Sequence, residues 1–349
     1  MHIEWIELVD YRNYRSLSYT PGPALNLLRG RNAQGKTNLI EALGLLLAGR
    51  SFRGARPTEM LHWDAPEGRV SGELARAEAS RGLRWVIGPR EAGACTVSGE
   101  RCPWARVIAF GWTDLALLNG GPGARRAFLD GFAAKLSPAH QAQQARYRQV
   151  LARRNALLQA PGAPGPALEP WDEQLARLGI ELIRRRRDSL AVLEGEVGAL
   201  HARLGGHGEV GLRYESALPA GADEAAFVAA LHARRGDEAR RRQTLVGPHR
   251  DDLRIEIEGR DMRLLGSRGQ QRVLALALRL AEVLPVTEAA GTAPVLLLDD
   301  ALSELDPIVA DNVLREIQSA EQVFLTSPEP VAINGAARWI VDSGGIAAA

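Results

Sequence analysis

Residues 30–37 read GRNAQGKT and match the pattern G-x-x-x-x-G-K-[ST] in full. Glycines let backbone N–H groups curl around an anion without a clash at Cβ. Lys36 supplies a positive charge that can reach the outer phosphates of a nucleotide, and Thr37 supplies a hydroxyl for Mg²⁺. The stretch therefore predicts a phosphate-binding loop, in which Lys36 both binds the nucleotide and takes part in catalysis.

The sequence on either side of this loop has the form that a phosphate-binding loop requires. Residues 25–28 predict a strand that ends just before Gly30, and apolar residues recur at helical spacing from residue 37 to residue 48. The free N–H groups at the start of that helix add to the anion site. The residues expected to contact the nucleotide are Gly30, Arg31, Asn32, Ala33, Gln34, Gly35, Lys36, Thr37 and Asn38.

An acidic pair follows a second apolar run. Residues 295–298 read VLLL, which is typical of a strand in a parallel sheet covered on both faces, and Asp299 and Asp300 come directly after it. A carboxylate of this kind, beside a phosphate loop, is a ligand of Mg²⁺ in such ATPases. We therefore expect Asp299 to hold Mg²⁺ together with Thr37, and Asp300 to orient or deprotonate the attacking water. The alternative is a strand that ends in two solvated acids.

A segment that reads LLGSRGQQ, at 264–271, lies just before an apolar helix. Ser267 would lie at the N-terminus of that helix, where free backbone N–H groups favour an anion. A serine N-cap with no ligand has the same sequence pattern, so both interpretations stay open at this point.

The chain divides into an α/β part and a helical part. The first 30 residues read as β, and residues 68–110 predict an antiparallel β section. Residues 123–204 are helical, with a proline- and glycine-rich tip at 160–170 and a long helix from about Trp171 to Leu204. We predict an α/β head formed by residues 1–112 and 243–349, with a helical hairpin arm inserted at 113–242. An arm that folds flat against the head is the alternative.

Composition excludes several classes of protein. The 349 residues carry a net charge of +1, so any affinity for nucleic acid must come from local patches. Cys95 and Cys102 have neither metal-ligand spacing nor the number needed for a disulfide framework. Charge comes too early for a signal peptide, and no run of 18 uncharged apolar residues occurs. We expect a cytoplasmic protein without a membrane partner.

Several of these motifs resemble those of ABC-type ATPases. Residues 267–270, SRGQ, resemble their signature motif, and Asp299-Asp300 resembles their Walker B pair. Residues 303–306, SELD, resemble their D-loop, and residues 324–327 fall where their switch segment would be. The serine at a helix N-terminus thus becomes a candidate nucleotide contact.

Longer strings narrow the resemblance to one family, RecF, which consists of DNA replication and repair mediators related to chromosome-maintenance ATPases. The resemblance covers about residues 3–342 and is weakest across the arm. The strings that carry it are DYRNY at 10–14, GRNAQGKTNLIEAL at 30–43, SFR at 51–53, GPHRDDL at 247–253, SRGQQR at 267–272 and LLLDDALSELD at 296–306.

The resemblance implies a fold, two cofactors and a composite site. The fold would be an ABC-type P-loop ATPase head, with a mixed sheet and an antiparallel β section, that carries the inserted arm. The cofactors would be ATP and Mg²⁺. Two copies would close over ATP, so that Ser267 of one touches the γ-phosphate bound to Lys36 of the other. The further nucleotide contacts implied by the family are Arg12, Asn13, Ser267, Gly269, Gln270 and Asp306.

Two positions depart from the usual ABC pattern, and the segment at 110–115 departs from that of the family. Asp300 stands where most ABC ATPases carry glutamate, which agrees with RecF and predicts slow hydrolysis because the shorter side chain lies further from the water. Ser327 stands at the switch position, which is often histidine. Asp114 is the candidate for the acidic residue that the family carries before the arm.

The implied partners are DNA at single-strand gaps and duplex junctions, RecR and RecO, and indirectly RecA, which the protein would help to load as an ATP-dependent homodimer. Arginine forks suit phosphate oxygens. The candidate DNA contacts are Arg184, Arg185, Arg186, Arg187, Arg234, Arg235, Arg240, Arg241 and Arg242. The alternative is a set of solvated helix faces in an arginine-rich protein.

Two other classes share the nucleotide motifs. The nucleotide-binding subunit of an ABC transporter would not normally carry a hairpin between phosphate loop and signature. A chromosome-tethering ATPase would carry a longer arm than the roughly 80 residues available here, and a zinc hook would need a CxxC motif that the sequence lacks.

Overall fold

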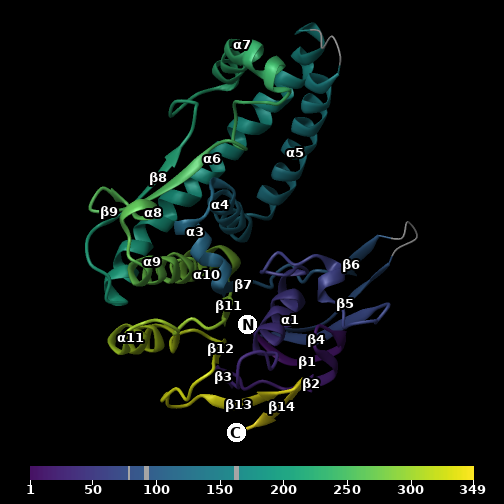
Figure 1. The fold of residues 1–349 in the computed structure, drawn as a ribbon, viewed down its shortest axis with the longest axis vertical. Coiled ribbons are helices and arrows are strands. Elements are labelled where there is room, and N and C mark those ends of the chain that lie inside the picture. The colour runs from purple at the N-terminus through teal and green to yellow at the C-terminus, as the bar shows by residue number, and fades with distance from the viewer. Residues whose placement is uncertain (78, 90–93, 161–164) are drawn as a thin grey trace. The chain divides into compact units, whose positions relative to one another are not determined.

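β3 (Leu25–Arg29), the strand before the phosphate loop, lies in the interior of a six-stranded sheet (Figure 1). The computed structural model describes residues 1–77, 79–89, 94–160 and 165–349. The strand order is β14-β13-β3-β12-β11-β7. The other strands of this sheet are β7 (Val107–Phe110), β11 (Val295–Leu298), β12 (Val323–Ser327), β13 (Ala337–Asp342) and β14 (Gly345–Ala348). Neighbours are parallel except β13 and β14, which confirms a mixed sheet.

A second sheet is antiparallel throughout and has the order β2-β1-β4-β5-β6. Its strands are β1 (His2–Tyr11), β2 (Tyr14–Tyr19), β4 (Gly68–Arg76), β5 (Ala79–Pro89) and β6 (Cys95–Gly99). The predicted antiparallel section at 68–110 is thus confirmed up to residue 99. The last strand of that section, β7, instead pairs in parallel with β11, and its sequence VIAF is a short apolar run like VLLL.

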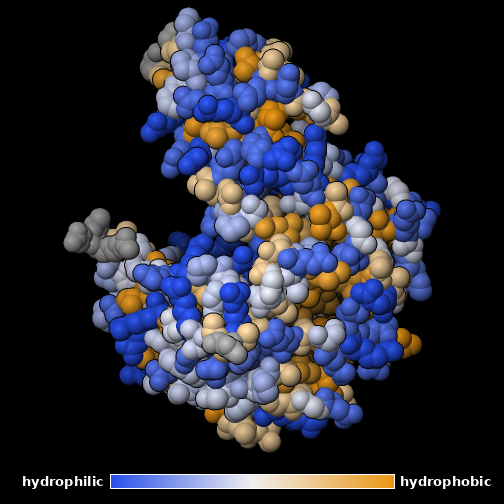
Figure 2. Space-filling view, turned by 180° about the vertical axis from the view of Figure 1, so that it is seen from behind, coloured by the Kyte–Doolittle hydropathy of each residue, from blue (hydrophilic) through white to orange (hydrophobic). Residues whose placement is uncertain are grey.

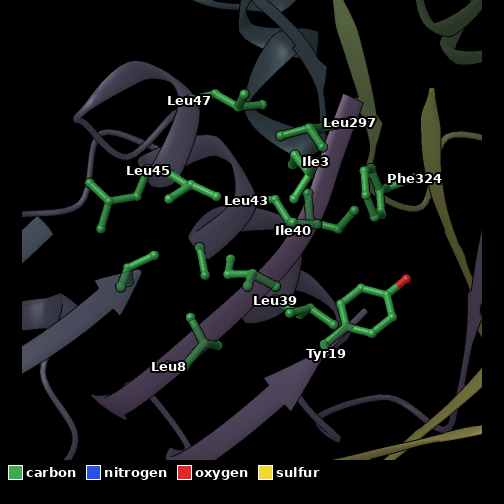
Figure 3. Packing of buried hydrophobic residues seen from close by; sticks show 14 of the residues in the cluster. Ile3, Leu8, Tyr19, Leu39, Ile40, Leu43, Leu45, Leu47, Leu297 and Phe324 are labelled. Atoms are coloured by element: carbon green, nitrogen blue, oxygen red, sulfur yellow. The ribbon is translucent and has the colours of Figure 1, made fainter. Parts of the chain in front are cut away.

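Helix α1 (Lys36–Ala48) supplies much of the core beside these two sheets and contacts strands of both. Leu39, Ile40 and Leu43 lie close to Leu8 of β1 and Phe324 of β12 in the cluster shown in Figure 3. Each buried leucine or phenylalanine contributes about 1.5–3 kcal/mol by leaving water. This packing fixes the helix, and hence the loop that precedes it, on the sheet.

The described residues form two compact units. Unit 1 comprises Met1–Leu115, Leu200–His207 and Ser267–Ala349, and contains both sheets described above. Its shorter elements are α2 (Pro57–Met60), the 3₁₀ turn η1 (Trp112–Leu115), α9 (Arg268–Leu280), α10 (Val283–Ala290) and α11 (Pro307–Ile317).

Unit 2 comprises Ala116–Ala199 and Gly208–Gly266. Its helices are α3 (Ala116–Asn119), α4 (Pro122–Leu136), α5 (Pro138–Gln159), α6 (Gly165–Arg203), α7 (Glu224–Arg241) and α8 (Met262–Leu265), where the last turn of α6 lies in unit 1. Its three-stranded antiparallel sheet consists of β8 (Val210–Glu215), β9 (Asp252–Ile257) and β10 (Arg260–Asp261), in the order β10-β9-β8. Residues 243–266 were expected in the head, but β9 pairs with β8 and lies in unit 2.

Helices α5 and α6 form an antiparallel hairpin. The Gln143 amide donates to the Leu178 carbonyl, and further along the pair Arg154 donates to Asp172. The expected non-helical tip at 160–170 is wrong at its end, because α6 begins at Gly165 and contains Pro170; residues 161–164 lie outside the described residues. Pro170 is the sixth residue of α6, beyond the first turn, and its missing N–H removes one bond of the helix ladder.

Buried arginines join the helices of unit 2. The Arg154 guanidinium, fully buried, donates to Asp172 at 2.7 Å, to Glu238 at 2.7 Å and to the Thr244 hydroxyl at 2.8 Å. It therefore connects α5, α6 and the end of α7. Each of these donors has an acceptor, which is the condition under which a buried charge is tolerated.

Among the described residues, none of the helices has both the length and the apolar composition needed to cross a membrane. On the face that Figure 2 shows, hydrophilic residues are interspersed with hydrophobic ones. The large hydrophobic side chains that are most exposed are Trp63, Trp112, Leu264, Leu265 and Ile308.

Candidate nucleotide site

The phosphate loop connects the end of β3 to the start of α1. Gly35 has φ +113° and is the N-cap of α1, a backbone conformation that favours glycine. At Gly30, a Cβ would lie 2.2 Å from the carbonyl oxygen of Val341, so no larger residue fits. Both glycines of the motif are therefore required by the backbone path of the loop itself.

Lys36 is buried at the centre of the loop. Its Nζ donates to the carbonyl oxygens of Gly30 at 2.7 Å and Arg31 at 3.0 Å. Burial lowers the pKa of Lys36, while Asp299 and Asp300 act in the opposite direction. The ammonium group thus bonds to the loop backbone, and the charges of the acidic pair favour its protonated form. Asn32 and Ala33 lie exposed beside it.

The turn between β1 and β2 braces the loop from one side. The Tyr14 hydroxyl donates to the Gly35 carbonyl at 2.9 Å, and Asn13 Nδ2 donates to the Gln34 carbonyl at 3.3 Å. Asn38 Nδ2 donates to Asn13 Oδ1 at 2.7 Å. The structure therefore brings Asn13 and Asn38, expected from the sequence to contact nucleotide, into one hydrogen-bonded group with the loop.

The turn between β13 and β14 braces the loop from the C-terminal end of the chain. Gln34 Oε1 accepts from the backbone N–H of Ser343 at 2.7 Å and from its hydroxyl at 3.2 Å. Ser343 and Gly344 both have positive φ, which brings the tight turn close to the loop. No motif in the sequence marked Ser343 as part of this site.

The predicted metal residues meet at the carboxyl edge of the parallel strands, although β12 separates β3 from β11 in the sheet. The Thr37 hydroxyl donates to Asp299 Oδ1 at 3.0 Å, and the Thr326 hydroxyl donates to the same oxygen at 2.9 Å. Burial raises the pKa of Asp299, and these two hydrogen bonds oppose that effect. Thr37 and Asp299 are therefore positioned as a pair of oxygen ligands.

Asp300 follows with its side chain toward solvent and φ +52°, a conformation that is uncommon for a residue other than glycine. Its N–H donates to Thr326 Oγ1 at 2.8 Å, and its carbonyl accepts from Arg272. Partial burial and the charge of Asp299 raise the pKa of Asp300, against the effect of Arg272. A raised pKa suits a carboxylate that accepts a proton from water.

Glu41 is a buried carboxylate that no sequence motif indicated, and it binds Arg12. Glu41 of α1 is fully buried and accepts from Arg12 Nε at 2.8 Å and Nη2 at 2.9 Å. It also accepts from the Ser51 hydroxyl at 2.5 Å and lies 3.6 Å from Arg53 Nη1. Arg53 in turn acts on the pKa of Asp299. Glu41 thus joins the DYRNY and SFR strings beside the phosphate loop.

The signature-like residues form an exposed helix start. Ser267 is the N-cap of α9: its hydroxyl accepts from the Gln270 N–H at 3.3 Å, while Gln270 Oε1 accepts from the Ser267 N–H at 2.9 Å. Gly269 has open space at its Cβ position. In the part of the chain that the structure describes, no hydrogen bond joins these residues to the loop at 30–37. Leu264 and Leu265, just before them, are 81% and 67% exposed.

Asp306 is also exposed and caps a helix. Its Oδ1 accepts from the N–H groups of Ile308 at 3.0 Å and Val309 at 3.1 Å, at the start of α11. One carboxylate oxygen of Asp306 therefore caps the N-terminus of α11.

Asp114 and Ser327, which stand in segments that depart from the expected motifs, have clear structural roles. Asp114 is buried and accepts from Arg279 of α9 and from the Gly111 N–H, so it holds η1 against α9. The Ser327 hydroxyl donates to the Glu329 carbonyl at 2.8 Å and makes a local turn. Asp299 is instead contacted by Thr326, one residue earlier.

The arginine clusters divide into structural and exposed members. Arg186 is buried and donates to Asp130 and to the Pro248 carbonyl, and Arg235 donates to Asp172 and the Gly165 carbonyl. Both are therefore structural, which contradicts their expected availability for DNA. Within the described residues, Arg241 and Arg242 are exposed, and their side chains have no hydrogen bond or ion pair.

Strands β3, β12 and β11 are parallel and lie side by side in the sheet. The phosphate loop follows β3, Thr326 lies near the end of β12, and the acidic pair follows β11. This arrangement defines the head of an ABC-type ATPase. The protein named "DNA replication and repair protein RecF" from Heliobacterium modesticaldum is 38% identical over 347 residues, which is 94% of this chain and 92% of the relative. The chain belongs to the RecF family.

Solved structures agree with this assignment. The complex described as the recombination mediator protein RecF with ATP, in the RecFOR pathway, matches with a TM-score of 0.88 and 27% identity, over 100% of this chain and 97% of that one. An SMC head bound to the C-terminal winged-helix domain of ScpA matches with a TM-score of 0.56 and 14% identity, over 100% of this chain and 98% of that one, and supports the fold alone. No family model matches the chain.

Proposed function

We propose that the chain is an ATP-operated switch that binds DNA at single-strand gaps and duplex junctions and helps to load RecA, together with RecR and RecO. The observation that carries the proposal is the convergence of Lys36, Thr37 and Asp299 at one edge of the parallel sheet. Membership of a family named for DNA replication and repair supports the biological role.

ATP binding depends on the phosphate loop and on the two turns, β1–β2 and β13–β14, that are hydrogen-bonded to it. Nζ of Lys36 donates to two carbonyl oxygens of the loop. When a triphosphate enters the loop, this ammonium group would bond to the phosphate oxygens in place of the two carbonyls. The N–H groups at the start of α1 and the helix dipole act on the same phosphates. A related protein was solved as RecF with ATP, which supports this ligand.

The donor set fits Mg²⁺. Thr37 Oγ1 and Asp299 Oδ1 are hard oxygen ligands of the kind that Mg²⁺ prefers, and they lie 3.0 Å apart. When bound, Mg²⁺ would supply positive charge that neutralises the outer phosphates. Asp299 and Thr37 would hold it, and Thr326 would keep Asp299 oriented.

Hydrolysis is assigned to Asp300. Its carboxylate is oriented by the positive φ of its backbone and by the hydrogen bond from its N–H to Thr326. Its raised pKa favours removal of a proton from the attacking water. The short side chain makes the step slow, as a switch requires, because the carboxylate reaches less far than that of a glutamate.

A second copy completes the site. Ser267, Gly269 and Gln270 are exposed and do not bond to the phosphate loop of their own chain within the described residues. The Ser267 oxygen accepts from a backbone N–H, so its proton is available to donate to a phosphate of the partner copy. ATP would therefore join two copies, and hydrolysis would release them.

DNA binding under control of ATP is the property to test. Fluorescence anisotropy of gapped, single-stranded and duplex DNA, each with and without ATP and Mg²⁺, measures it directly. We expect ATP to strengthen binding to the gapped substrate, and the Lys36→Met variant to lose that response. Equal affinity with and without ATP would contradict the switch, while DNA binding itself would remain.

A further inference from the structure

We propose that Thr326 is a positioning residue for the ATPase reaction, one that holds the metal-binding carboxylate of Asp299 and the backbone of Asp300 in a fixed mutual arrangement. The inference rests on the proposed function. Thr326 Oγ1 lies 2.9 Å from Asp299 Oδ1 and 2.8 Å from the Asp300 nitrogen. Thr326 is 1% exposed, so water does not substitute for these bonds.

The direction of each hydrogen bond follows from the groups involved. The Asp300 N–H is a donor only, so the Thr326 oxygen accepts from it. The single hydroxyl proton of Thr326 then goes to Asp299 Oδ1. One side chain therefore couples both acids, because a shift of either one breaks or bends a bond to the same oxygen.

The sheet topology explains why β12 provides this residue. β12 lies between β3, which leads into the phosphate loop, and β11, which ends at the acidic pair. In the register of the sheet, Leu325 is opposite Leu298, so Thr326 is level with Asp299. On its other side Thr326 is opposite Leu28, just before the loop. A polar residue here lies between the phosphate loop and the catalytic acids.

Thr326 also stabilises the unfavourable backbone conformation of Asp300. A residue other than glycine at φ +52° is energetically unfavourable unless its surroundings hold it. The bond from the Asp300 N–H supplies such a constraint and fixes the direction in which the Asp300 side chain leaves the backbone. The hydroxyl therefore affects the proposed base and the metal ligand through two separate bonds.

The neighbouring residue provides a matched control. Ser327 is also buried at the end of β12, but its hydroxyl donates to the Glu329 carbonyl and accepts from the Glu329 N–H. It has the same functional group in the same strand, and within the described part of the chain it bonds to neither acid. Removal of the Ser327 hydroxyl should therefore leave the metal site and the hydrolysis rate unchanged.

The test compares Thr326→Val, which keeps the shape and removes the hydroxyl, with Thr326→Ser, which keeps the hydroxyl. Three quantities are measured: affinity for ATP without metal, affinity for Mn²⁺ in the presence of a non-hydrolysable ATP analogue by electron paramagnetic resonance, and kcat. Loss of a group that orients a metal ligand typically costs about 10–100-fold in metal affinity or activity. We expect losses of that size in Mn²⁺ affinity and kcat for Thr326→Val, with metal-free ATP affinity unchanged.

Thr326→Ser should restore both quantities to near the wild-type values, and Ser327→Ala should match the wild type. Circular dichroism verifies that each variant is folded, and Thr326→Ala replaces Thr326→Val if the valine variant is not. A folded Thr326→Val or Thr326→Ala variant with wild-type Mn²⁺ affinity and kcat would overturn this inference and leave the proposed function standing. A wild-type chain that binds no ATP would contradict the proposed function and, with it, this inference.

Discussion

The hydroxyl of Thr37 donates to the carboxylate of Asp299 over 3.0 Å, although the two residues lie 262 positions apart in the chain. Thr37 lies in the first turn of the helix after β3 and Asp299 follows β11, and β12 separates these two strands in the sheet. The carboxyl ends of parallel strands share one edge, so residues from both ends of the chain form a single site there. The two motifs are thus parts of one oxygen-rich centre beside Lys36.

Replacement of Lys36 by methionine should abolish measurable ATP binding while the fold is retained. Lys36 is buried among carbonyl oxygens and is the loop's cation, so methionine fills its volume but leaves the phosphates without a direct positive charge. Isothermal titration with ATP measures the effect. Wild-type affinity in the variant would show that the nucleotide binds elsewhere.

Replacement of Glu41 by glutamine should destabilise unit 1 and weaken ATP binding. The amide would present a donor to Arg12 and leave a guanidinium without its carboxylate, and the removal of one partner of a buried pair typically costs about 3–5 kcal/mol. Urea denaturation and ATP titration measure the two effects. Glu59→Gln removes an exposed carboxylate that pairs with Arg56 and should change neither.

Acid should weaken unit 2 through His249, whose ring accepts from the Tyr147 hydroxyl and donates to the Thr244 carbonyl. Burial lowers the pKa of His249 to about 4, and Arg250, Arg126 and Arg154 add to that effect. The unfolded chain therefore takes up the proton first. Stability is complete above about pH 6.5 and is lost as the pH falls toward about 4, by on the order of 3 kcal/mol.

The His249→Asn variant isolates this contribution. Burial raises the pKa of Asp251, which favours the folded state as the pH falls, but that effect is common to both proteins. Denaturation midpoints between pH 7 and pH 4 should decline more steeply for the wild type than for the variant. Parallel curves would rule out His249 as the source of the pH dependence.

Neutralisation of Arg241 and Arg242 should reduce the salt dependence of DNA binding. Both are exposed at the end of α7 without partners among the described residues, so their guanidinium groups are available to phosphates. For every phosphate that the variant no longer neutralises, the slope of log K against log salt should fall by about 1. Arg56→Gln, which alters an exposed arginine paired with Glu59 and outside the candidate DNA contacts, serves as the control. An unchanged slope for the Arg241 and Arg242 variant would mean that DNA binds to other residues.

Local sequence patterns predicted the phosphate loop, the acidic pair and the capped helix, because each is defined by a few adjacent residues. Glu41 was missed because its partners, Arg12 and Ser51, come from separate segments and a glutamate in a helix usually faces water. The available signal was its place in the stretch LIEALGLLL at 39–47, where every other residue is apolar or glycine.

The run of four arginines at 184–187 illustrates why the arm was harder to interpret. On α6, Arg186 shares a face with Leu182 and Leu190, and this buried face meets Asp130. Composition alone suggests four exposed charges, whereas helical spacing identifies the one that is buried. The β8–β9 pairing was missed because it joins strands about 40 residues apart with no short turn between them.

The closure of two copies over ATP is tested most directly by the molar mass in solution, measured by light scattering with saturating ATP and Mg²⁺. We expect a monomer without nucleotide and a dimer with it. Ser267→Arg should bind ATP normally yet stay monomeric, because the bulky side chain would occupy the place of the partner's phosphate. A wild-type chain that binds ATP and remains a monomer would contradict the composite site.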